Sequence, residues 1–548
     1  MRAAHTVAQV RAAEAPLLEG LPPGALMQRA VHGLLSHAVR RLGRRVYGSR
    51  VVVLAGGGDN GGDALWTGAR LAARGARVDA LAPGRTHLEG TAALLAAGGR
   101  LHPVAAPGEV PAEPTEDGSE ALPDATVAAL LARADLVLDG LLGIGGRGGL
   151  RAAHARLAEL TPPERTIAVD VPSGVDADTG AAPGTAIRAA LTVTFGTYKR
   201  GLLLGDGAAH AGELALVDIG LGLPAPDLVA LDDADVAALL PAPGPADSKY
   251  TRGVLGLVGG SDRYPGAAVL ATGGALRGGA GYLRVVAEAR AAEHVRGAHP
   301  ETVVTVIEPG DADAMLAAGR VQAWAFGPGV VPDAAARRLL DALVATDVPL
   351  LLDAGALDPF ADAFAAGFPA RAGAGVGVGF TAGFTGGGGG GAARSTGRDV
   401  LARRAGPVVL TPHEGEFARL TATALGWDAA GTRRELADDR LGTVRRAAAA
   451  LGATVLLKGN RTLIVGPDGA TRVNTTGTPW LGSAGTGDVL TGLAGSLLAT
   501  GLGALDAASV AAYLHGVAGQ LAPHPLSAAD LPVALPAAIA RVLRSAAG

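Results

Sequence analysis

Short apolar segments of strand type alternate with helical segments along almost the whole chain, and this alternation constrains the fold most strongly. Strand candidates lie at residues 50–55, 136–139, 167–170, 191–195, 254–258, 348–353, 408–411 and 455–458, and residues 63–74 have helical spacing. Short apolar strands separated by helices are typical of parallel sheets that helices cover on both faces. We therefore predict an α/β protein whose ligands bind beyond the carboxyl ends of the strands.

The chain is too long for a single core. At 548 residues it is expected to form about two to four domains. The stretch 223–247 is rich in proline and aspartate, as a linker followed by a domain entry would be. We therefore predict domains at 1–222 and 223–548. Two inserts, the acidic, proline-rich 102–124 and the glycine-rich 369–395, are expected to take no part in chemistry.

Composition argues against several classes of function. The net charge of −4 gives no support for binding to nucleic acid or to an anionic membrane. We find neither an apolar signal core nor a credible membrane helix. Cysteine is absent, which excludes thiolate metal sites, thiol nucleophiles and disulfides and fits a reducing compartment. We therefore expect a cytoplasmic protein with no nucleic-acid or membrane partner.

The most informative motif is Gly485-Thr486-Gly487-Asp488, which opens an apolar, helix-like run. The first turn of a helix has unpartnered N–H groups and a positive dipole end, so it suits a phosphate. A carboxylate beside a phosphate is electrostatically unfavourable unless it has a function, such as holding a metal ion or accepting a proton from an attacking hydroxyl. The alternative is a plain helix cap. We favour a phosphate-handling active site.

In the first half, residues 56–63 (Gly-Gly-Gly-Asp-Asn-Gly-Gly-Asp) follow a strand and precede a helix. They satisfy the G-x-G-x-x-G pattern of dinucleotide-binding loops, but a tight turn is the alternative in so glycine-rich a chain. Two more strand ends carry acids and glycines, at 138–148 and 169–180. Oxygens of Asn, Asp and Ser suit a hard cation, and a glycine-rich loop lets the backbone approach a pyrophosphate.

Taken together, four segments of the first half make it resemble the NAD(P)H-hydrate epimerase domain. They are residues 58–63, Asp139 with its glycine loop, 169–176 (Val-Asp-Val-Pro-Ser-Gly-Val-Asp) and 194–199 (Thr-Phe-Gly-Thr-Tyr-Lys). The resemblance covers 1–222 and implies a Rossmann-like, doubly wound three-layer α/β domain.

The same resemblance implies the residues of the first site. Potassium would be bound by Asn60, Asp139 and Ser173, and Asp170 would transfer a proton. The hydrated nucleotide would be contacted by Asp59, Asn60, Gly61, Gly62, Asp63, Gly143, Ile144, Gly145, Gly146, Arg147, Gly148, Gly149 and Asp170. Asp59 stands where the family often has a second asparagine.

The second half is similar to the ribokinase-like ADP/ATP-dependent NAD(P)H-hydrate dehydratases over 223–548, chiefly at residues 411–417 (Thr-Pro-His-Glu-Gly-Glu-Phe) and 484–488. The resemblance implies a second doubly wound three-layer α/β domain. The adenine nucleotide would be bound by Lys458, Gly459, Asn460, Arg461, Thr462 and Gly487. The hydrated nicotinamide nucleotide would face Gly329, His413 and Asp488, with Asp488 catalytic. Read without the resemblance, His413 alone indicates a surface or capping histidine, and Lys458 a solvated side chain.

We therefore predict a bifunctional nicotinamide-nucleotide repair enzyme. One domain interconverts the R and S epimers of hydrated NADH or NADPH, with K⁺, and the other dehydrates the S form at the expense of ADP or ATP, with Mg²⁺. We also expect a homo-oligomer. The alternatives are a ribokinase-like small-molecule kinase with an accessory nucleotide-binding domain, a Rossmann-type oxidoreductase, and a first domain that only binds its ligand.

Overall fold

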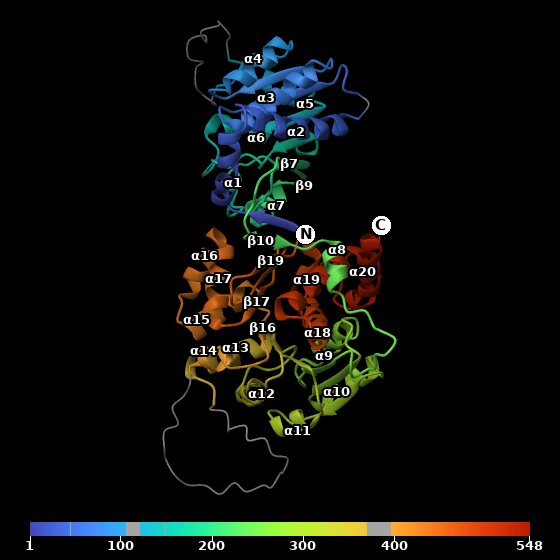
Figure 1. Cartoon of the computed structure of the whole chain (residues 1–548). Coiled ribbons are helices and arrows are strands. Elements are labelled where there is room, and N and C mark those ends of the chain that lie inside the picture. The colour runs from blue at the N-terminus through green and yellow to red at the C-terminus, as the bar shows by residue number, and fades with distance from the viewer. Residues whose placement is uncertain (44, 106–120, 147, 370–395, 548) are drawn as a thin grey trace. The chain divides into compact units, whose positions relative to one another are not determined.

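The computed structural model describes residues 1–43, 45–105, 121–146, 148–369 and 396–547, and it separates into two compact units (Figure 1). The N-terminal unit is Arg2–Val229, and the C-terminal unit is Ala230–Gly548 together with Met1. Residues 223–229 belong to the N-terminal unit, where Asp227 accepts a hydrogen bond from Arg200 (2.8 Å). The functional division at 222/223 stays a prediction. Most of the insert 102–124 and nearly all of 369–395 lie outside the described residues.

The sheet of the N-terminal unit has the strand order β4-β3-β2-β5-β6-β7-β9, and all neighbouring strands run parallel. A separate parallel pair joins β1 to β8. The strands are β1 (Arg2–His5), β2 (Arg50–Ala55), β3 (Arg77–Ala82), β4 (Arg100–Pro103), β5 (Leu136–Gly140), β6 (Thr166–Val169), β7 (Leu191–Phe195), β8 (Tyr198–Lys199) and β9 (Glu213–Val217). The helices are α1 (Val7–Gly20), α2 (Ala25–Leu42), α3 (Asp59–Ala72), α4 (Leu88–Ala96), α5 (Asp124–Ala132), α6 (Ala152–Leu160) and α7 (Gly205–His210).

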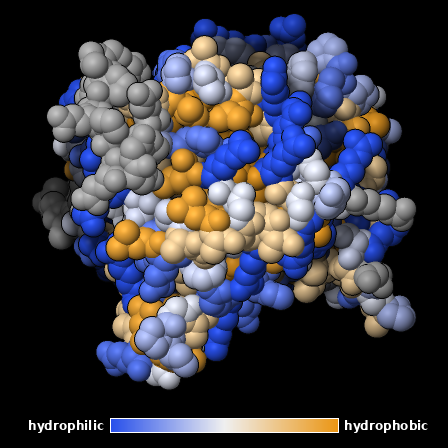
Figure 2. Space-filling view, turned by 90° about the horizontal axis from the view of Figure 1, so that it is seen from above, coloured by the Kyte–Doolittle hydropathy of each residue, from blue (hydrophilic) through white to orange (hydrophobic). Residues whose placement is uncertain are grey.

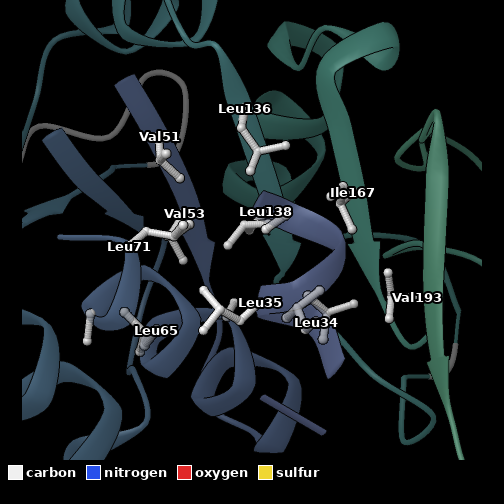
Figure 3. Packing of buried hydrophobic residues seen from close by; sticks show 14 of the residues in the cluster. Leu34, Leu35, Val51, Val53, Leu65, Leu71, Leu136, Leu138, Ile167 and Val193 are labelled. Atoms are coloured by element: carbon white, nitrogen blue, oxygen red, sulfur yellow. The ribbon is translucent and has the colours of Figure 1, made fainter. Parts of the chain in front are cut away.

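Alternate residues of this sheet face two separate cores, because successive side chains of a strand point to opposite faces. Val51 and Val53 of β2 pack with residues of α2 and α3, and Figure 3 shows this core. Val52 and Leu54 pack on the other face with residues of α5 and α6. Helices therefore cover both faces, as the sequence predicts for a doubly wound fold.

The sheet of the C-terminal unit contains the strand order β13-β12-β11-β14-β15-β16-β17-β18-β19. Its strands run parallel as far as β17, and β18 and β19 are antiparallel. Its strands are β11 (Val254–Val258), β12 (Tyr282–Ala287), β13 (Val303–Val306), β14 (Ala323–Phe326), β15 (Leu350–Leu352), β16 (Val408–Leu410), β17 (Thr454–Leu457), β18 (Leu463–Val465) and β19 (Thr471–Val473), and β10 (Leu228–Ala230) spans the point in the sequence where the units meet.

The helices of this unit are α8 (Asp233–Leu239), α9 (Pro265–Ala275), α10 (Ala289–Ala298), α11 (Ala312–Ala317), α12 (Ala334–Ala345), α13 (Leu357–Ala366), α14 (Gly397–Ala402), α15 (Glu414–Leu425), α16 (Ala429–Asp438), α17 (Arg440–Leu451), α18 (Thr486–Ala499), α19 (Ala504–Leu521) and α20 (Asp530–Ala547). Glycine lets α9 and α18 pack closely. A Cβ on Gly492 would lie 1.8 Å from the carbonyl oxygen of Ala271, and one on Gly274 would lie 2.1 Å from that of Val489. This close packing fixes the position of the start of α18.

The prediction of parallel, helix-covered sheets is confirmed, and the candidate strands all occur within a residue or two. The helix predicted from residue 63 begins earlier, at Asp59, because the extended Gly58 ends the preceding turn. None of the helices in the described ranges is both long and apolar enough to span a membrane. On the face shown in Figure 2, hydrophilic and hydrophobic residues are mixed.

Candidate active sites

Glycines in the turn between β2 and α3 allow two backbone segments to approach each other closely. A Cβ on Gly56 would lie 2.1 Å from the carbonyl oxygen of Leu141, and one on Gly61 would lie 2.0 Å from that of Gly56. Asp59 opens α3, and the N-cap Gly58 offers no side chain to the first turn. The first N–H groups of α3 are therefore left for a ligand, which suits an anion.

Asn60, Asp139 and Ser173, the predicted potassium ligands, meet at the carboxyl ends of β5 and β6. The Ser173 hydroxyl donates to Asp139 (2.6 Å) and lies 3.3 Å from the carbonyl oxygen of Leu142. Asn60 donates from Nδ2 to the carbonyls of Leu142 (3.4 Å) and Val169 (2.5 Å). The structure thus brings the three predicted residues into one cluster.

This cluster has the chemistry of a site for a hard cation. Burial raises the pKa of Asp139 to about 6. Hydrogen bonds from Ser173 and from the N–H of Leu141 lower the pKa, but burial has the larger effect. A cation at the cluster would stabilise the ionised form of this buried carboxylate. In the described ranges, no three His, Cys, Asp or Glu side chains gather as a metal site. The oxygens available here are instead carboxylate, amide, hydroxyl and backbone carbonyl, which fit a potassium ion.

Asp170, the predicted proton-transfer residue, forms a buried ion pair. It follows β6 with a positive φ of 65°, a strained conformation that occurs preferentially at functional sites. Its Oδ1 accepts hydrogen bonds from the Thr194 hydroxyl (3.0 Å), the Phe195 N–H (3.1 Å) and the Lys199 ammonium. The Lys199 and Asp170 side chains are only 2% and 7% exposed. Asp170 Oδ1 is therefore held by several donors, one of them a charged ammonium.

A cavity of about 840 Å³ lies against these loops and has a volume in the range of ligand pockets. The predicted substrate residues that line it are Asp59, Asn60, Gly61, Gly143, Ile144, Gly145, Gly146 and Gly149. Gly148 lines a smaller neighbouring cavity with Ser173. Arg147 lies outside the described residues.

Three predicted substrate residues, Gly62, Asp63 and Asp170, do not line this cavity. Gly62 faces Met27 and His87. Asp63 is buried, and its Oδ1 has no hydrogen-bond partner. Burial raises the pKa of Asp63 well above its ordinary value, and the charge of Asp170 adds to the rise. Asp63 is therefore a buried carboxyl group that does not reach the cavity.

In the C-terminal unit, the Gly-Thr-Gly-Asp motif forms the start of α18. Gly485 is the N-cap with φ of 87°, which favours glycine. Thr486 donates from its hydroxyl to the carbonyl of Leu481 (2.7 Å), and its own carbonyl accepts from the buried ring of His515 (2.9 Å). Burial lowers the pKa of His515 to about 4, so this ring is neutral at pH 7. These contacts hold the turn before Asp488.

Lys458 and Asp488 belong to a charged cluster that lies at the ends of β15 and β17 and the starts of α15 and α18. Lys458 Nζ lies 2.7 Å from Asp353 and 3.8 Å from Glu416, and the Thr491 hydroxyl donates to Asp353 (2.6 Å). Burial lowers the pKa of Lys458, but the charges of Asp353 and Glu416 outweigh it and raise the pKa overall. Lys458 is therefore a half-buried cation paired with acids and not a fully solvated side chain.

Burial also raises the pKa of Asp488, to about 7. The charges of Asp353 and Glu416 add to the rise, and Lys458 opposes it. A carboxylate with a pKa near the working pH is suited to accept a proton during a reaction. A Cβ on Gly487 would lie 3.4 Å from Lys458 Nζ. The motif and the lysine therefore lie side by side, as a phosphoryl-transfer site requires.

The remaining predicted residues of the C-terminal unit lie on loops. Residues 458–462 connect β17 to β18, where the Thr462 hydroxyl donates to the carbonyl of Gly459 (2.9 Å) and Arg461 donates to that of Thr475 (2.8 Å). Asn460 is exposed. Gly329, with φ of 68°, has its carbonyl bound by the Ser261 hydroxyl (2.8 Å).

His413 caps α15, because its Nδ1 accepts from the N–H groups of Gly415 (3.0 Å) and Glu416 (3.3 Å). The contacts of His413 in the structure are therefore those of a helix-capping residue, as the sequence indicates without the resemblance. Its role toward substrate stays a prediction.

Four residues of these sites had no role in the sequence interpretation. Lys199 and Glu416 stand inside the motifs quoted there, and Asp353 ends a predicted strand, but none of their pairings could be read from the sequence. Glu14 on α1 lines the large cavity and lies in no recognised motif.

Comparison with known proteins matches both halves of the chain to family models. Residues 23–201 match the YjeF-related protein N-terminus, and residues 255–374 and 389–541 match the NAD(P)H-hydrate dehydratase family. A similar protein from Mycobacterium tuberculosis (strain CDC 1551 / Oshkosh), named bifunctional NAD(P)H-hydrate repair enzyme Nnr, is 42% identical over 93% of this chain and 92% of its own length. One of the same name from Mycobacterium leprae is 40% identical over 97% and 96%.

Among solved structures, the chain is similar to the ADP/ATP-dependent NAD(P)H-hydrate dehydratase from Bacillus subtilis co-crystallised with ATP/Mg²⁺. The identity is 30%, the TM-score is 0.46, and the match covers 57% of this chain and 98% of that chain.

Proposed function

This chain belongs to the family of bifunctional NAD(P)H-hydrate repair enzymes, and we propose how its two units divide that activity. The N-terminal unit epimerises hydrated NADH or NADPH, and the C-terminal unit dehydrates the S epimer at the expense of ADP or ATP. The kinase alternative is not favoured, because both family models match in one chain. Only one epimer is dehydrated, so a chain that also interconverts the epimers can repair both.

In the N-terminal unit, the loops at Asp59–Gly61 and Gly143–Gly149 hold the hydrated dinucleotide against the large cavity. Exposed N–H groups at the start of α3 support contact with the phosphates. Asp170 lies at the end of β6 and moves the proton. Asn60, Asp139 and Ser173 are the potassium ligands, and a potassium ion bound there supplies a fixed positive charge beside the phosphate-binding loops.

In the C-terminal unit, Asp488 accepts the proton of the ring hydroxyl, and the hydroxyl oxygen then attacks the terminal phosphorus of the adenine nucleotide. Hydroxide is a poor leaving group, whereas the phosphate made in this step leaves readily. The N–H groups at Gly485–Gly487 and the Lys458 ammonium stabilise the charge on the transferring group. Magnesium, when bound with the nucleotide, neutralises phosphate charge.

The remaining assignments follow the motifs. Lys458–Thr462 and Gly487 bind the adenine nucleotide, and Gly329 and His413 contact the hydrated nicotinamide nucleotide. We also propose that the protein works in the cytoplasm, where reduced nicotinamide nucleotides are used, and that it forms a homo-oligomer, which size-exclusion chromatography with light scattering would test.

The observation that best supports the dehydratase assignment is the geometry around Asp488. Asp488, whose pKa is raised to about 7, lies in the first turn of α18, and the half-buried Lys458 lies beside Gly487. The test is incubation of the S hydrate with ADP or ATP in turn, followed by the absorbance of the reduced nicotinamide. A rise that needs one of the nucleotides supports the assignment, and nucleotide consumption without reduced nicotinamide refutes it.

A further inference from the structure

Epimerisation at the hydrated carbon of the nicotinamide ring requires two proton transfers, and the proposed function assigns only Asp170. The carbon–oxygen bond breaks when the hydroxyl accepts a proton and leaves as water, while the lone pair of the ring nitrogen forms a carbon–nitrogen double bond. Water then adds to the opposite face and gives up a proton. One group must donate a proton and another must accept one. Asp170 is the acceptor of the proposed function, and Thr194, Phe195 and Lys199 hold its Oδ1.

We propose that Glu14 is the proton donor that works with Asp170 in this epimerisation. The inference rests on the proposed function of the N-terminal unit. In the reverse direction the two roles exchange, and the cavity that Glu14 lines lets its carboxyl group regain its starting protonation through solvent.

Glu14 reaches the site from α1, outside the loops that carry the recognised motifs. It lines the cavity of about 840 Å³ together with Asp59, Asn60 and residues of the Gly143–Gly149 loop. It is only partly exposed, and neither a hydrogen bond nor an ion pair within the described ranges occupies its carboxyl group. The group is therefore available to a ligand in the cavity.

The chain places α1 firmly relative to the Asp170–Lys199 pair. His5 of β1 pairs in register with Lys199 of β8, the lysine that binds Asp170. Asp178 then accepts a hydrogen bond from the N–H of Val7 (2.9 Å), which begins α1. The strand that leads into α1 is β1, and it thus pairs with β8, which carries the lysine that binds Asp170. This pairing fixes Glu14 relative to Asp170.

The environment of Glu14 raises its pKa, chiefly through burial. Among the neighbouring charges, Lys199 and Arg11 lower the pKa and Asp170 and Asp59 raise it, and the net effect is a rise. Asp170, by contrast, receives hydrogen bonds and an ammonium. Two carboxyl groups in such different environments suit the separate donor and acceptor roles of acid–base catalysis.

The other acids near the cavity fit the donor role less well. Asp59 also lines the cavity, but it is exposed. Asp63 does not line the cavity. Glu14 lines the cavity from a partly buried position, and its pKa is raised.

The experiment compares Glu14→Gln, Glu14→Asp and the control Glu19→Gln, all in the full chain. Glu19 lies on the same helix and is exposed. Epimerisation is followed by chromatographic separation of the R and S hydrates without adenine nucleotide, so that dehydration cannot proceed. It is measured over a range of pH, and in ¹⁸O-labelled water to count hydroxyl exchange. Dehydration of the S form with nucleotide, measured on each variant, reports folding of the C-terminal unit, and thermal unfolding reports the N-terminal unit.

We expect Glu14→Gln to slow epimerisation and label exchange by about 10²- to 10⁴-fold, as for loss of one acid–base group, with KM little changed. In the pH profile of epimerisation, the limb on which the rate falls as pH rises should be present in the parent and absent from Glu14→Gln. Glu14→Asp should keep that limb at a reduced rate, and Glu19→Gln should match the parent. If Glu14→Gln epimerises within about threefold of the parent, or keeps that limb, the proposal is wrong. If the parent itself does not epimerise, the proposed function of this unit fails instead.

If Glu14→Gln is less stable than the parent, Glu14→Asp still tests the proposal. A merely structural role of Glu14 gives no reason for the fall of the epimerisation rate at high pH to depend on a carboxyl group at this position.

Discussion

Replacing Asp488 by Asn should make the C-terminal unit more stable above neutral pH while abolishing dehydration. The pKa of this carboxyl is raised from 3.8 to about 7, first by burial and then by the charges of Asp353 and Glu416. A carboxyl whose pKa is higher in the folded than in the unfolded state contributes stability at low pH, and that stability is lost as pH rises toward the folded pKa. The loss therefore develops between about pH 4 and pH 7 and is complete above that.

The magnitude follows from the size of the rise. At about 1.4 kcal/mol for each tenfold change, moving the pKa from 3.8 to about 7 corresponds to at most roughly 4 kcal/mol. Asn resembles the protonated acid in size and charge. The variant should match the parent near pH 4 and exceed it near pH 8, by several kcal/mol at most. Because Asn cannot accept the hydroxyl proton, dehydration should fall by about 10²- to 10⁴-fold.

Calorimetric unfolding of the full chain at both pH values, combined with the dehydration assay, checks both parts. The matched control is Asp313→Asn, an exposed acid in the first turn of α11, which should change neither quantity appreciably. Epimerisation should persist in both variants. Equal stability of the Asp488→Asn variant and the parent at pH 8 would refute the assigned electrostatics. A dehydration rate within about threefold of the parent would refute the catalytic role.

Three further changes test other parts of the sites. Dialysed protein should epimerise faster with KCl than with LiCl, and Ser173→Ala should need more potassium for half-maximal rate, because it removes one oxygen ligand. Lys199→Met leaves Asp170 as a buried, unpaired charge and should cost the N-terminal unit about 3–5 kcal/mol, measured by thermal unfolding, while dehydration persists. Gly487→Ala adds a methyl group that contacts only flexible side-chain ends. It should fold normally but dehydrate slowly, unlike the control Gly266→Ala, whose added Cβ meets nothing within 4 Å.

The fold could be predicted from the sequence because the periodicity of buried strands is a local signal. Strands such as 191–195 and 254–258 occur at their predicted positions, since a fully buried parallel strand must be apolar throughout. The antiparallel hairpin of β18 and β19 was not predicted. Its strands are only three residues long, too short for alternation to be recognised.

The site was only partly predictable for a physical reason. Strand-end loops carry recognisable motifs, so Asn60, Asp139 and Ser173 could be expected at one edge of the sheet, and the structure brings them together. Pairings between distant segments leave no local pattern. The contact of Lys458 with Asp353 joins residues 105 positions apart, and the position of Glu14 depends on how β1 pairs with β8. Such contacts appear only when the chain is folded.

The most direct test of the central claim uses the R hydrate as the only starting material. The full chain is incubated with it, ADP or ATP, magnesium and potassium, and the absorbance of the reduced nicotinamide is followed to completion. If both activities reside in this chain, the R hydrate should be converted completely to reduced nucleotide, faster than its spontaneous epimerisation allows. Asp170→Asn should limit the rate to the spontaneous value while leaving conversion of the S hydrate unchanged. Conversion of the S hydrate alone by the parent would contradict the bifunctional assignment.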